Sequence, residues 1–294
     1  MLALIAGRGQ LPGHILAAHG APVLVAALEG FAPEHLTPDI TFRVERLGSF
    51  IADLKARGVT AICMAGAIGR PALDPAMIDA ATLPLVPRMM QALAQGDDGA
   101  LRVVIALFEE AGFTIRAAHD ICPDLLMPEG VPTRAQPGPQ HQAAARLGMA
   151  TIADMGRSDT GQACVIQRAD VLAREGADGT DAMLARLGSG ASSTDPDPLT
   201  WGFTAITDAA TTALDWLGGR EGADHSGAIL VKAPKPQQDR RVDLPTIGPG
   251  TAMRAADAGL DGIVIEAGGV IVLDRDAMLR ILDERGLFLW VRGA

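Results

Sequence analysis

The chain has 294 residues and a formal net charge of −10, from 25 Lys and Arg against 35 Asp and Glu. This charge excludes a nucleic-acid binder that works by bulk electrostatics, so an anionic substrate must meet a local cluster of cations or a metal. A hydrophobic share of 48% supports a large core, and the length favours two domains, because single cores stop growing at roughly 250–300 residues.

The first half alternates short aliphatic runs with helical patterns, which is typical of βαβ units and a mainly parallel sheet. The predicted strands are residues 2–6, 23–27, 61–65 and 113–117. The predicted helices are a short one after the turn 7–13, one that Ser49 caps and Gly58 ends, and two at 88–95 and 99–111.

A segment dense in proline and glycine, residues 127–140, keeps neither helix nor strand periodicity. It predicts a first domain at residues 1–128, a linker at 129–140, and a second domain at 141–294. The chain is therefore expected to divide into two α/β domains.

The second half indicates a mixed sheet. Its predicted strands are residues 163–167, 171–174, 229–232, 262–266, 270–273 and 287–291. The strands at 262–266 and 270–273 are expected to form a tight hairpin across Gly268 and Gly269.

Three helices are expected between and after these strands: residues 178–187, one that begins at Pro249 or Thr251, and one that Asp274 caps and Gly286 ends. A fourth, amphipathic helix is predicted from the apolar spacing between Phe203 and Leu217. Packing on the core is its default role, and covering acyl chains or lying on a membrane surface are the alternatives.

The chain carries no predicted targeting or membrane-spanning segment. Its N-terminus lacks a basic region before the apolar stretch, and no uncharged apolar run approaches the roughly 18–20 residues of a membrane helix. Cys63, Cys122 and Cys164 lack metal-ligand spacing and are expected to be reduced thiols. A soluble, cytoplasmic protein is therefore predicted.

A glycine-rich turn, residues 7–13, follows a predicted strand and precedes a helix, where backbone N–H groups bind phosphate. It departs from the dinucleotide fingerprint because Pro12 stands at the sixth position, where that pattern has glycine. A turn required only for packing and a phosphate cradle both remain open.

The segment 232–251 gathers four cations, two carboxylates and a glycine-bounded turn within 20 positions. Lys and Arg neutralise a pyrophosphate, and an Asp holds Mg²⁺ or orients an attacking water. The alternative is a solvated basic loop with surface ion pairs. Because proline, glycine and threonine interrupt the run, we interpret it as a positioned site.

Other acidic and histidine positions allow two interpretations. Asp97 or Asp98 suits a helix cap, and the carboxylates Glu175 and Asp178 suit either a cap or a metal site. His119 lies at the carboxyl end of a predicted strand, although a lone histidine is more often structural. Motifs of serine hydrolases, zinc proteases and P-loop kinases do not occur.

Motifs along nearly the whole chain resemble those of the LpxI-type UDP-2,3-diacylglucosamine pyrophosphatases of lipid A biosynthesis. The matching residues are Leu4-Ile5-Ala6-Gly7 with Gly9, Leu11 and Pro12; Ala65-Gly66 with Arg70-Pro71; Gly96-Asp97-Asp98; Ala118-His119; Gly161-Gln162; Glu175 with Gly179-Thr180-Asp181-Ala182-Met183-Leu184; Lys232-Ala233-Pro234-Lys235-Pro236; Arg241-Val242-Asp243-Leu244-Pro245-Thr246-Ile247-Gly248; and Gly262-Ile263-Val264 with Glu266-Ala267-Gly268.

The resemblance implies an α/β fold with an N-terminal Rossmann-like parallel-sheet domain, a C-terminal mixed α/β catalytic domain and the substrate between them. It also implies Mg²⁺-dependent hydrolysis of the pyrophosphate of UDP-2,3-diacylglucosamine to UMP and 2,3-diacylglucosamine 1-phosphate. The family's essential aspartate corresponds to Asp243, which is expected to bind Mg²⁺ or to align the attacking water. We further infer that Lys232, Lys235 and Arg241 screen the charge that develops on the phosphoryl oxygens.

Further residues are expected to bind the substrate on the same resemblance. They are Gly7, Gly9, Leu11, Pro12, Arg70, Asp98, His119, Thr180, Asp181, Lys235, Thr246 and Gly248. No nucleic-acid partner is expected, and peripheral contact with the inner face of the inner membrane and a homodimer are left open.

Two other functions compete with this prediction. A nicotinamide-dependent oxidoreductase is suggested only by the N-terminal strand, turn and helix, and the incomplete glycine pattern opposes it. A noncatalytic nucleotide or lipid binding protein would use the same cradle and cations. Asp243 opposes that alternative, because a carboxylate facing a diphosphate repels it.

Overall fold

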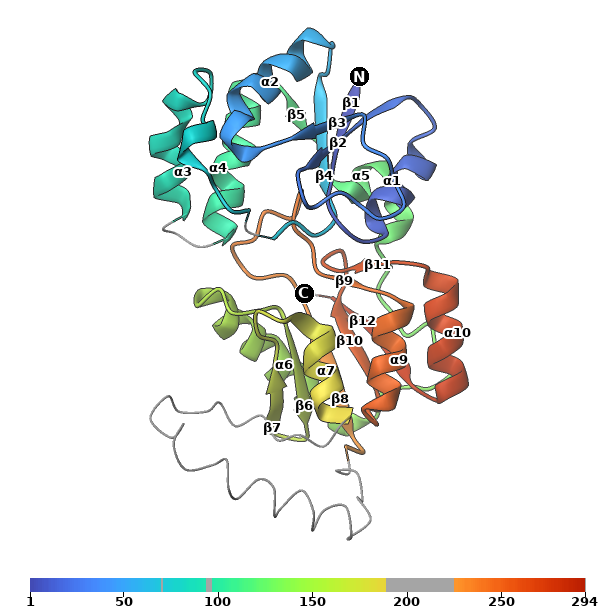
Figure 1. The fold of residues 1–294 in the computed structure, drawn as a ribbon. Helices are drawn as coiled ribbons and strands as arrows, with labels where there is room; N and C mark the ends of the chain where they lie inside the picture. Colours follow the sequence, from blue (N-terminus) through green and yellow to red (C-terminus); the bar gives the residue numbers. More distant parts are fainter. Residues whose placement is uncertain (70, 94–96, 189–224, 294) are drawn as a thin grey trace, which may run out of the picture.

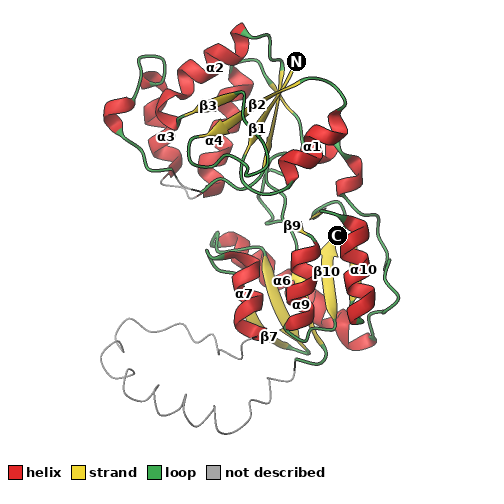
Figure 2. Cartoon of the chain, turned by 45° about the vertical axis from the view of Figure 1, so that its right-hand side comes forward, coloured by secondary structure: helices red, strands yellow, loops and turns green. Residues whose placement is uncertain are grey.

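The computed structural model describes residues 1–69, 71–93, 97–188 and 225–293. Two five-stranded sheets, each flanked by helices, form two lobes stacked one above the other (Figures 1 and 2). We call them the first lobe, built on the N-terminal sheet, and the second lobe, built on the C-terminal sheet. The predicted fold class, a parallel sheet followed by a mixed one, is confirmed.

All strand pairs of the first sheet are parallel, in the order β3-β2-β1-β4-β5. The strands are β1 (Leu2–Ala6), β2 (Val23–Leu28), β3 (Ile40–Phe42), β4 (Ala61–Ala65) and β5 (Thr114–Ile115). Its helices are α1 (Leu11–His19), α2 (Leu47–Ala56), α3 (Val86–Leu93), α4 (Asp97–Glu110) and α5 (Ala118–Ile121).

Strand β1 is apolar throughout because helices cover both faces of the sheet. Its odd residues, Ala3 and Ile5, pack in the core cluster beside α2 and α4. Its even residues, such as Leu4, pack in the cluster that contains Ile15 of α1 and Ala118 of α5. Figure 1 shows that the carboxyl ends of β1 and β4 point toward the second lobe.

The second sheet has the order β12-β10-β8-β6-β7, with parallel pairs among the first three strands and antiparallel pairs among the last three. The strands are β6 (Ala163–Gln167), β7 (Asp170–Arg174), β8 (Ala228–Lys232), β10 (Gly262–Glu266) and β12 (Phe288–Arg292). Its helices are α6 (Pro139–Arg157), α7 (Gly179–Gly188), α9 (Pro249–Asp257) and α10 (Arg275–Arg285).

Helix α6 covers one face of this sheet, and α7, α9 and α10 cover the other. Helix α6 was not predicted from the sequence, and its first residue, Pro139, lies inside the proline-rich segment 127–140. Proline suits that first position because its missing N–H would have no intrahelical partner there. Gly148 lets α6 approach β8 closely, since a Cβ there would lie 2.4 Å from a methyl of Val231.

The predicted hairpin across Gly268 and Gly269 is wrong. Strand β11 (Ile271–Val272) leaves the sheet of β10 and pairs in parallel with β9 (Thr246–Ile247). Both faces of β11 are buried, with Val272 in the second lobe's core and Ile271 in the core cluster of β1. Strand β10 is already paired with β12 on one edge and with β8 on the other, so it has no edge free for a hairpin partner.

The structure also differs from the sequence-based predictions at two helix caps and at one edge strand. Ser49 is the third residue of α2 rather than its cap, and the edge strand β3 was not predicted because only three residues form it. Asp274 stands at the cap position of α10 without a capping hydrogen bond. The helix expected between Phe203 and Leu217 lies outside the described residues.

The remaining general expectations concern cysteines and membrane spans. Cys63 and Cys164 are buried, Cys122 is partly buried, and all three are free thiols. Burial raises the pKa of Cys63 and of Cys164 to about 12, so neither is a reactive thiolate. No helix in the described part of the chain is long and apolar enough to cross a membrane.

Candidate functional site

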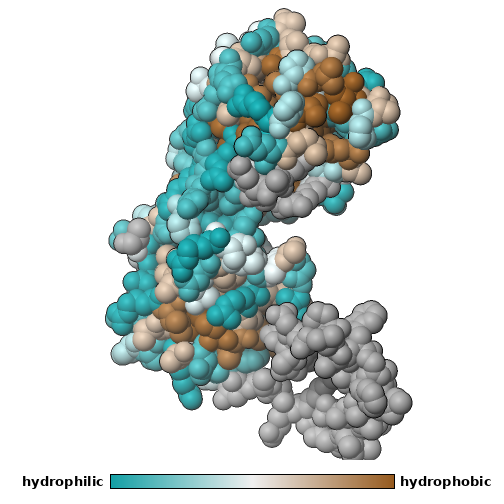
Figure 3. All heavy atoms as spheres, turned by 90° about the vertical axis from the view of Figure 1, so that its left-hand side faces the viewer, coloured by the Kyte–Doolittle hydropathy of each residue, from teal (hydrophilic) through white to brown (hydrophobic). Residues whose placement is uncertain are grey.

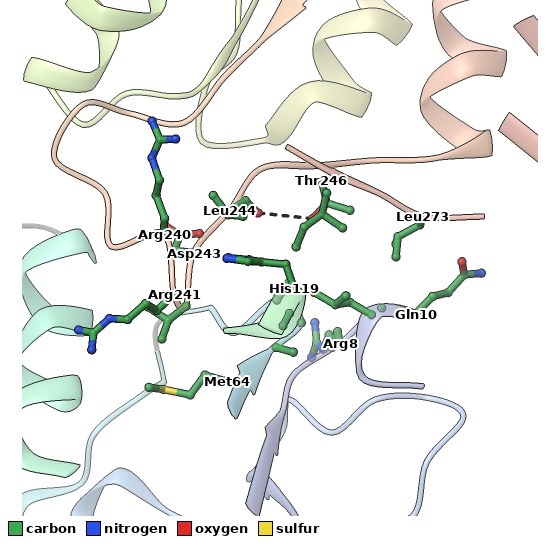
Figure 4. A pocket seen from close by; sticks show the side chains of 18 residues that line it. Arg8, Gln10, Met64, His119, Arg240, Arg241, Asp243, Leu244, Thr246 and Leu273 are labelled. Carbon is green, nitrogen blue, oxygen red and sulfur yellow. Dashed lines mark hydrogen bonds between the residues drawn. The ribbon is translucent and has the colours of Figure 1, made fainter. Parts of the chain in front are cut away.

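A pocket of about 330 Å³ lies between the two lobes (Figure 4). The first lobe contributes residues 8–11 after β1, 64–67 at the end of β4, and Ala118 and His119 of α5. The second lobe contributes residues 240–244 and 246, with Ile271 and Leu273. The pocket thus occupies the carboxyl ends of parallel strands, where open α/β sheets bind ligands.

The glycine turn after β1 is fixed by contact with the turn after β4. The N–H of Gly7 donates to the carbonyl of Ala65 at 2.8 Å, and Arg8 and Ala67 exchange two backbone hydrogen bonds at 2.9 Å. A Cβ on Gly7 would lie 2.7 Å from the Ala67 carbonyl oxygen. Gly7 therefore serves packing, which was one of the two interpretations of this turn.

Gly9, by contrast, lines the pocket, with a φ of +95° and no atom within 4 Å of a Cβ placed there. Arg8 turns away from the pocket's centre, because its guanidinium donates to the Gly30 carbonyl at 2.7 Å and lies 5.2 Å from the ring centre of Phe31. The open side of the turn at Gly9 is the part that remains available to a ligand.

Asp243 enters the pocket on a segment that reaches across from the second lobe. Val242 packs in the core cluster beside α4, and Leu244 packs in the cluster of β1 and α1. Asp243 lies between these two anchors and lines the pocket, with the imidazole of His119 directed toward it (Figure 4). The acid and the histidine thus come from different lobes.

The pKa of Asp243 is raised above its ordinary value, chiefly because burial removes water from the carboxyl group. The carboxylates of Asp98 and Asp159 raise this pKa further, whereas Gln238 and Lys235 oppose the shift. Asp243 therefore takes up a proton more readily than an exposed aspartate.

Lys235 lies beside this carboxyl group and joins the two lobes. Its Nζ donates to both carboxylate oxygens of Asp98, at 2.9 and 3.1 Å, and to Asp159 at 2.5 Å. Burial alone would lower the pKa of Lys235, but these hydrogen bonds raise it on balance. Lys235 is therefore a permanent cation at the edge of the site.

The two neighbouring arginines have different partners. Arg241 donates from Nε and Nη2 to Asp239, at 3.0 and 2.7 Å, and from Nη1 to Glu109 at 2.7 Å. These bonds raise the pKa of Arg241. Arg240 forms an ion pair with the buried carboxylate of Glu266, with its Nη2 2.8 Å from Oε1. Both arginines line the pocket, and Arg240 was not predicted as a site residue.

Lys232 does not line this pocket. Its side chain is 7% exposed, and its Nζ donates to the Thr180 hydroxyl at 2.7 Å. Thr180 donates in turn to Glu175, whose other oxygen accepts the N–H of Gln162 at 2.7 Å. Burial lowers the pKa of Lys232, and Glu175 is the first of the charges that oppose this. The cluster lies within the second lobe.

The structure brings together part of the predicted site. The pocket is lined by Gly9, Leu11, His119, Arg241, Asp243 and Thr246. Asp98 and Lys235 adjoin it, and Asp98 shares a smaller hollow with Asp243. Gly7, Pro12, Gly248, Lys232, Thr180 and Asp181 do not line it, and Arg70 lies outside the described residues. These placements leave the roles of all these residues as predictions.

Sequence reasoning missed several contributors to the site. They are Glu109, Asp159, Gln238, Arg240 and Glu266. Gln238 and Arg240 stand inside the cation-rich segment and were noticeable there. Asp159 is 76 residues from Lys235, and Glu109 is 132 residues from Arg241. The local sequence pattern therefore could not predict these contacts.

The side chains around Asp243 fit Mg²⁺ only if the substrate and water supply most of its ligands. Among the described residues, no group of three or more His, Cys, Asp or Glu side chains is arranged to hold a metal. Mg²⁺ commonly binds through one or two carboxylates together with substrate phosphates and water. Asp243 suits that mode, in which the ion arrives with a diphosphate.

Fold and site together define a two-lobed α/β protein with a pocket at the lobe boundary that arginines, a histidine and an aspartate line. Two family descriptions match the chain, the LpxI N-terminal domain at residues 1–125 and the LpxI C-terminal domain at residues 128–290. A relative, the UDP-2,3-diacylglucosamine pyrophosphatase LpxI of Caulobacter vibrioides, is 37% identical over 98% of this chain and 96% of its own length. The chain belongs to the LpxI family, which confirms the resemblance found in its sequence.

Proposed function

We propose that the protein is a hydrolase that cleaves the pyrophosphate bond of UDP-2,3-diacylglucosamine in lipid A biosynthesis. The products would be UMP and 2,3-diacylglucosamine 1-phosphate. Family membership and the Caulobacter vibrioides relative, whose name carries this activity, support the reaction class. The substrate would bind in the pocket between the lobes.

The observation that carries this proposal is the state of Asp243. Three neighbouring carboxylates are each paired with a cation, Asp98 and Asp159 with Lys235, and Asp239 with Arg241. Within the described residues, Asp243 forms no such ion pair. A carboxylate that lines an anion pocket without a cation of its own repels the ligand. Its presence there is explained if it has a chemical task in the reaction.

That task is the handling of the attacking water. A carboxylate accepts a hydrogen bond from water and directs the water oxygen at phosphorus. Bound Mg²⁺ would add positive charge at the diphosphate oxygens, and Asp243 is the residue that would hold it. His119 lines the pocket from the first lobe and would donate a hydrogen bond to a phosphate oxygen.

The cations that precede Asp243 in the chain stabilise the negative charge that develops on the phosphate oxygens. Phosphoryl transfer depends mainly on positioning and on fixed positive charge near the phosphate oxygens. Arg240 and Arg241 line the pocket and Lys235 lies at its edge, each already held by carboxylates. Because these partners hold the cations in place before the ligand arrives, little reorganisation is needed.

The test is the incubation of purified protein with UDP-2,3-diacylglucosamine, with Mg²⁺ or with EDTA, followed by mass spectrometry of the products. We expect UMP and the lipid phosphate with Mg²⁺ and loss of both with EDTA. Binding of the intact substrate without products would instead indicate a noncatalytic binding protein. Quenching or energy transfer on titration with NADH would favour an oxidoreductase.

A further inference from the structure

Helix α4 of the first lobe holds the segment that leads to Asp243 at two places. Near its N-terminus, Asp98 accepts two hydrogen bonds from Lys235, and near its C-terminus, Glu109 accepts one from Arg241. The two residues lie eleven positions apart on the helix, which corresponds to about 16 Å. The junction between the lobes is accordingly hydrophilic on this side (Figure 3).

Both cations are also fixed on their own side. Lys235 bonds Asp159, which follows α6, and Arg241 bonds Asp239 through two nitrogens. Each cation therefore reaches α4 from a restrained position, which lowers the entropy cost of the contact between the lobes. Val242 then packs in the core beside α4, immediately before Asp243.

We propose that Glu109 and Asp98 are positioning residues, which act through Arg241 and Lys235 to hold Asp243 against the first lobe. This inference rests on the proposed function, because the position of Asp243 matters through the reaction. Without the two contacts, the lobes and Asp243 would spend less time in the arrangement that forms the pocket. A substrate that spans both lobes would then bind with an apparent affinity reduced by the lost population.

A neighbouring residue of α4 provides a matched control for the Glu109 substitution. Glu110, next to Glu109, pairs with Arg88 of α3 at 2.7 and 2.9 Å, entirely within the first lobe. Both glutamates are substantially exposed, 44% for Glu109 and 58% for Glu110. Glu109→Gln and Glu110→Gln therefore remove the same charge from neighbouring positions, and only the first removes a contact between the lobes.

We expect Glu109→Gln to raise KM by about threefold to fivefold, which is the size of effect that an exposed ion pair gives, with kcat within about twofold of wild type. Glu110→Gln should leave both constants unchanged. In an Arg241→Gln background, Glu109→Gln should add no further loss, since Glu109 acts through Arg241. An equal effect of the two glutamine variants, or an undiminished effect in the Arg241→Gln background, would overturn the proposal.

A second measurement does not depend on turnover. Small-angle X-ray scattering of the Asp98→Asn/Glu109→Gln double variant should show a larger radius of gyration than the wild type and Glu110→Gln, because the lobes separate more often. An unchanged radius with an unchanged KM would contradict the role of α4. A wild-type protein without turnover, but with the expected scattering difference, would refute the proposed reaction and leave the contact between the lobes established.

Discussion

Replacing Lys232 by methionine is expected to destabilise the protein rather than to slow its chemistry. Lys232 is 7% exposed and donates a hydrogen bond to the Thr180 hydroxyl, which in turn donates to Glu175. Glu175 is itself 9% exposed and interacts electrostatically with Lys232, so the substitution leaves a buried carboxylate without this compensating charge. Leaving a buried charge without a compensating charge typically costs about 3–5 kcal/mol.

The assay is urea unfolding at pH 7, together with kcat measured per folded molecule. Lys232→Met should lower the free energy of unfolding by about 3–5 kcal/mol. Adding Glu175→Gln should recover part of this loss, because the double variant no longer buries an uncompensated charge. A Lys232→Met protein within about 1 kcal/mol of wild type but with a large fall in kcat would refute this reasoning. It would restore the sequence-based prediction that Lys232 is catalytic.

Two further predictions concern the first lobe. Hydrogen bonds from Arg43 and from the N–H of Asp74 hold the pKa of the buried Glu45 carboxyl at about 2, below its ordinary 4.5. The ionised Glu45 therefore contributes fully to stability above pH 4.5, and this contribution is lost as the pH falls toward 2. Glu45→Gln should lower the free energy of unfolding at pH 7 by about 1–3 kcal/mol and weaken its acid dependence in urea titrations; an unaltered pH profile would contradict this. Gly7→Ala should cost about 2 kcal/mol or more in thermal unfolding, because its Cβ meets the backbone of Gly66, and a neutral effect would show that the two turns can separate.

The parallel strands were predictable because their burial on both faces leaves continuous apolar runs between turns. Strands β1, β4 and β10 have the predicted bounds. Elements whose partners lie in the other lobe were not predictable in this way. Strand β11 looks like half of a hairpin, yet Ile271 packs on the cluster of β1, which no pattern near Gly268 indicates.

The candidate site was predictable where it follows strand ends. Gly9 and His119 come directly after strands of the first sheet, and Asp243 stands in an unusual cation-rich segment. Lys232 shows the limit of this reasoning. It shares a face of β8 with Leu230, and that face packs on α7 and α9, so its side chain meets Thr180 instead of the pocket.

The central claim is that Asp243 performs the hydrolysis rather than shaping the pocket. The most direct test compares UMP release by wild type and Asp243→Asn in the presence of Mg²⁺, with substrate binding and unfolding of both proteins measured alongside. The asparagine keeps the size of the side chain and removes its charge. We expect a loss of turnover of about a hundredfold or more, with binding and cooperative unfolding retained. Turnover close to wild type in a folded Asp243→Asn protein would contradict the account.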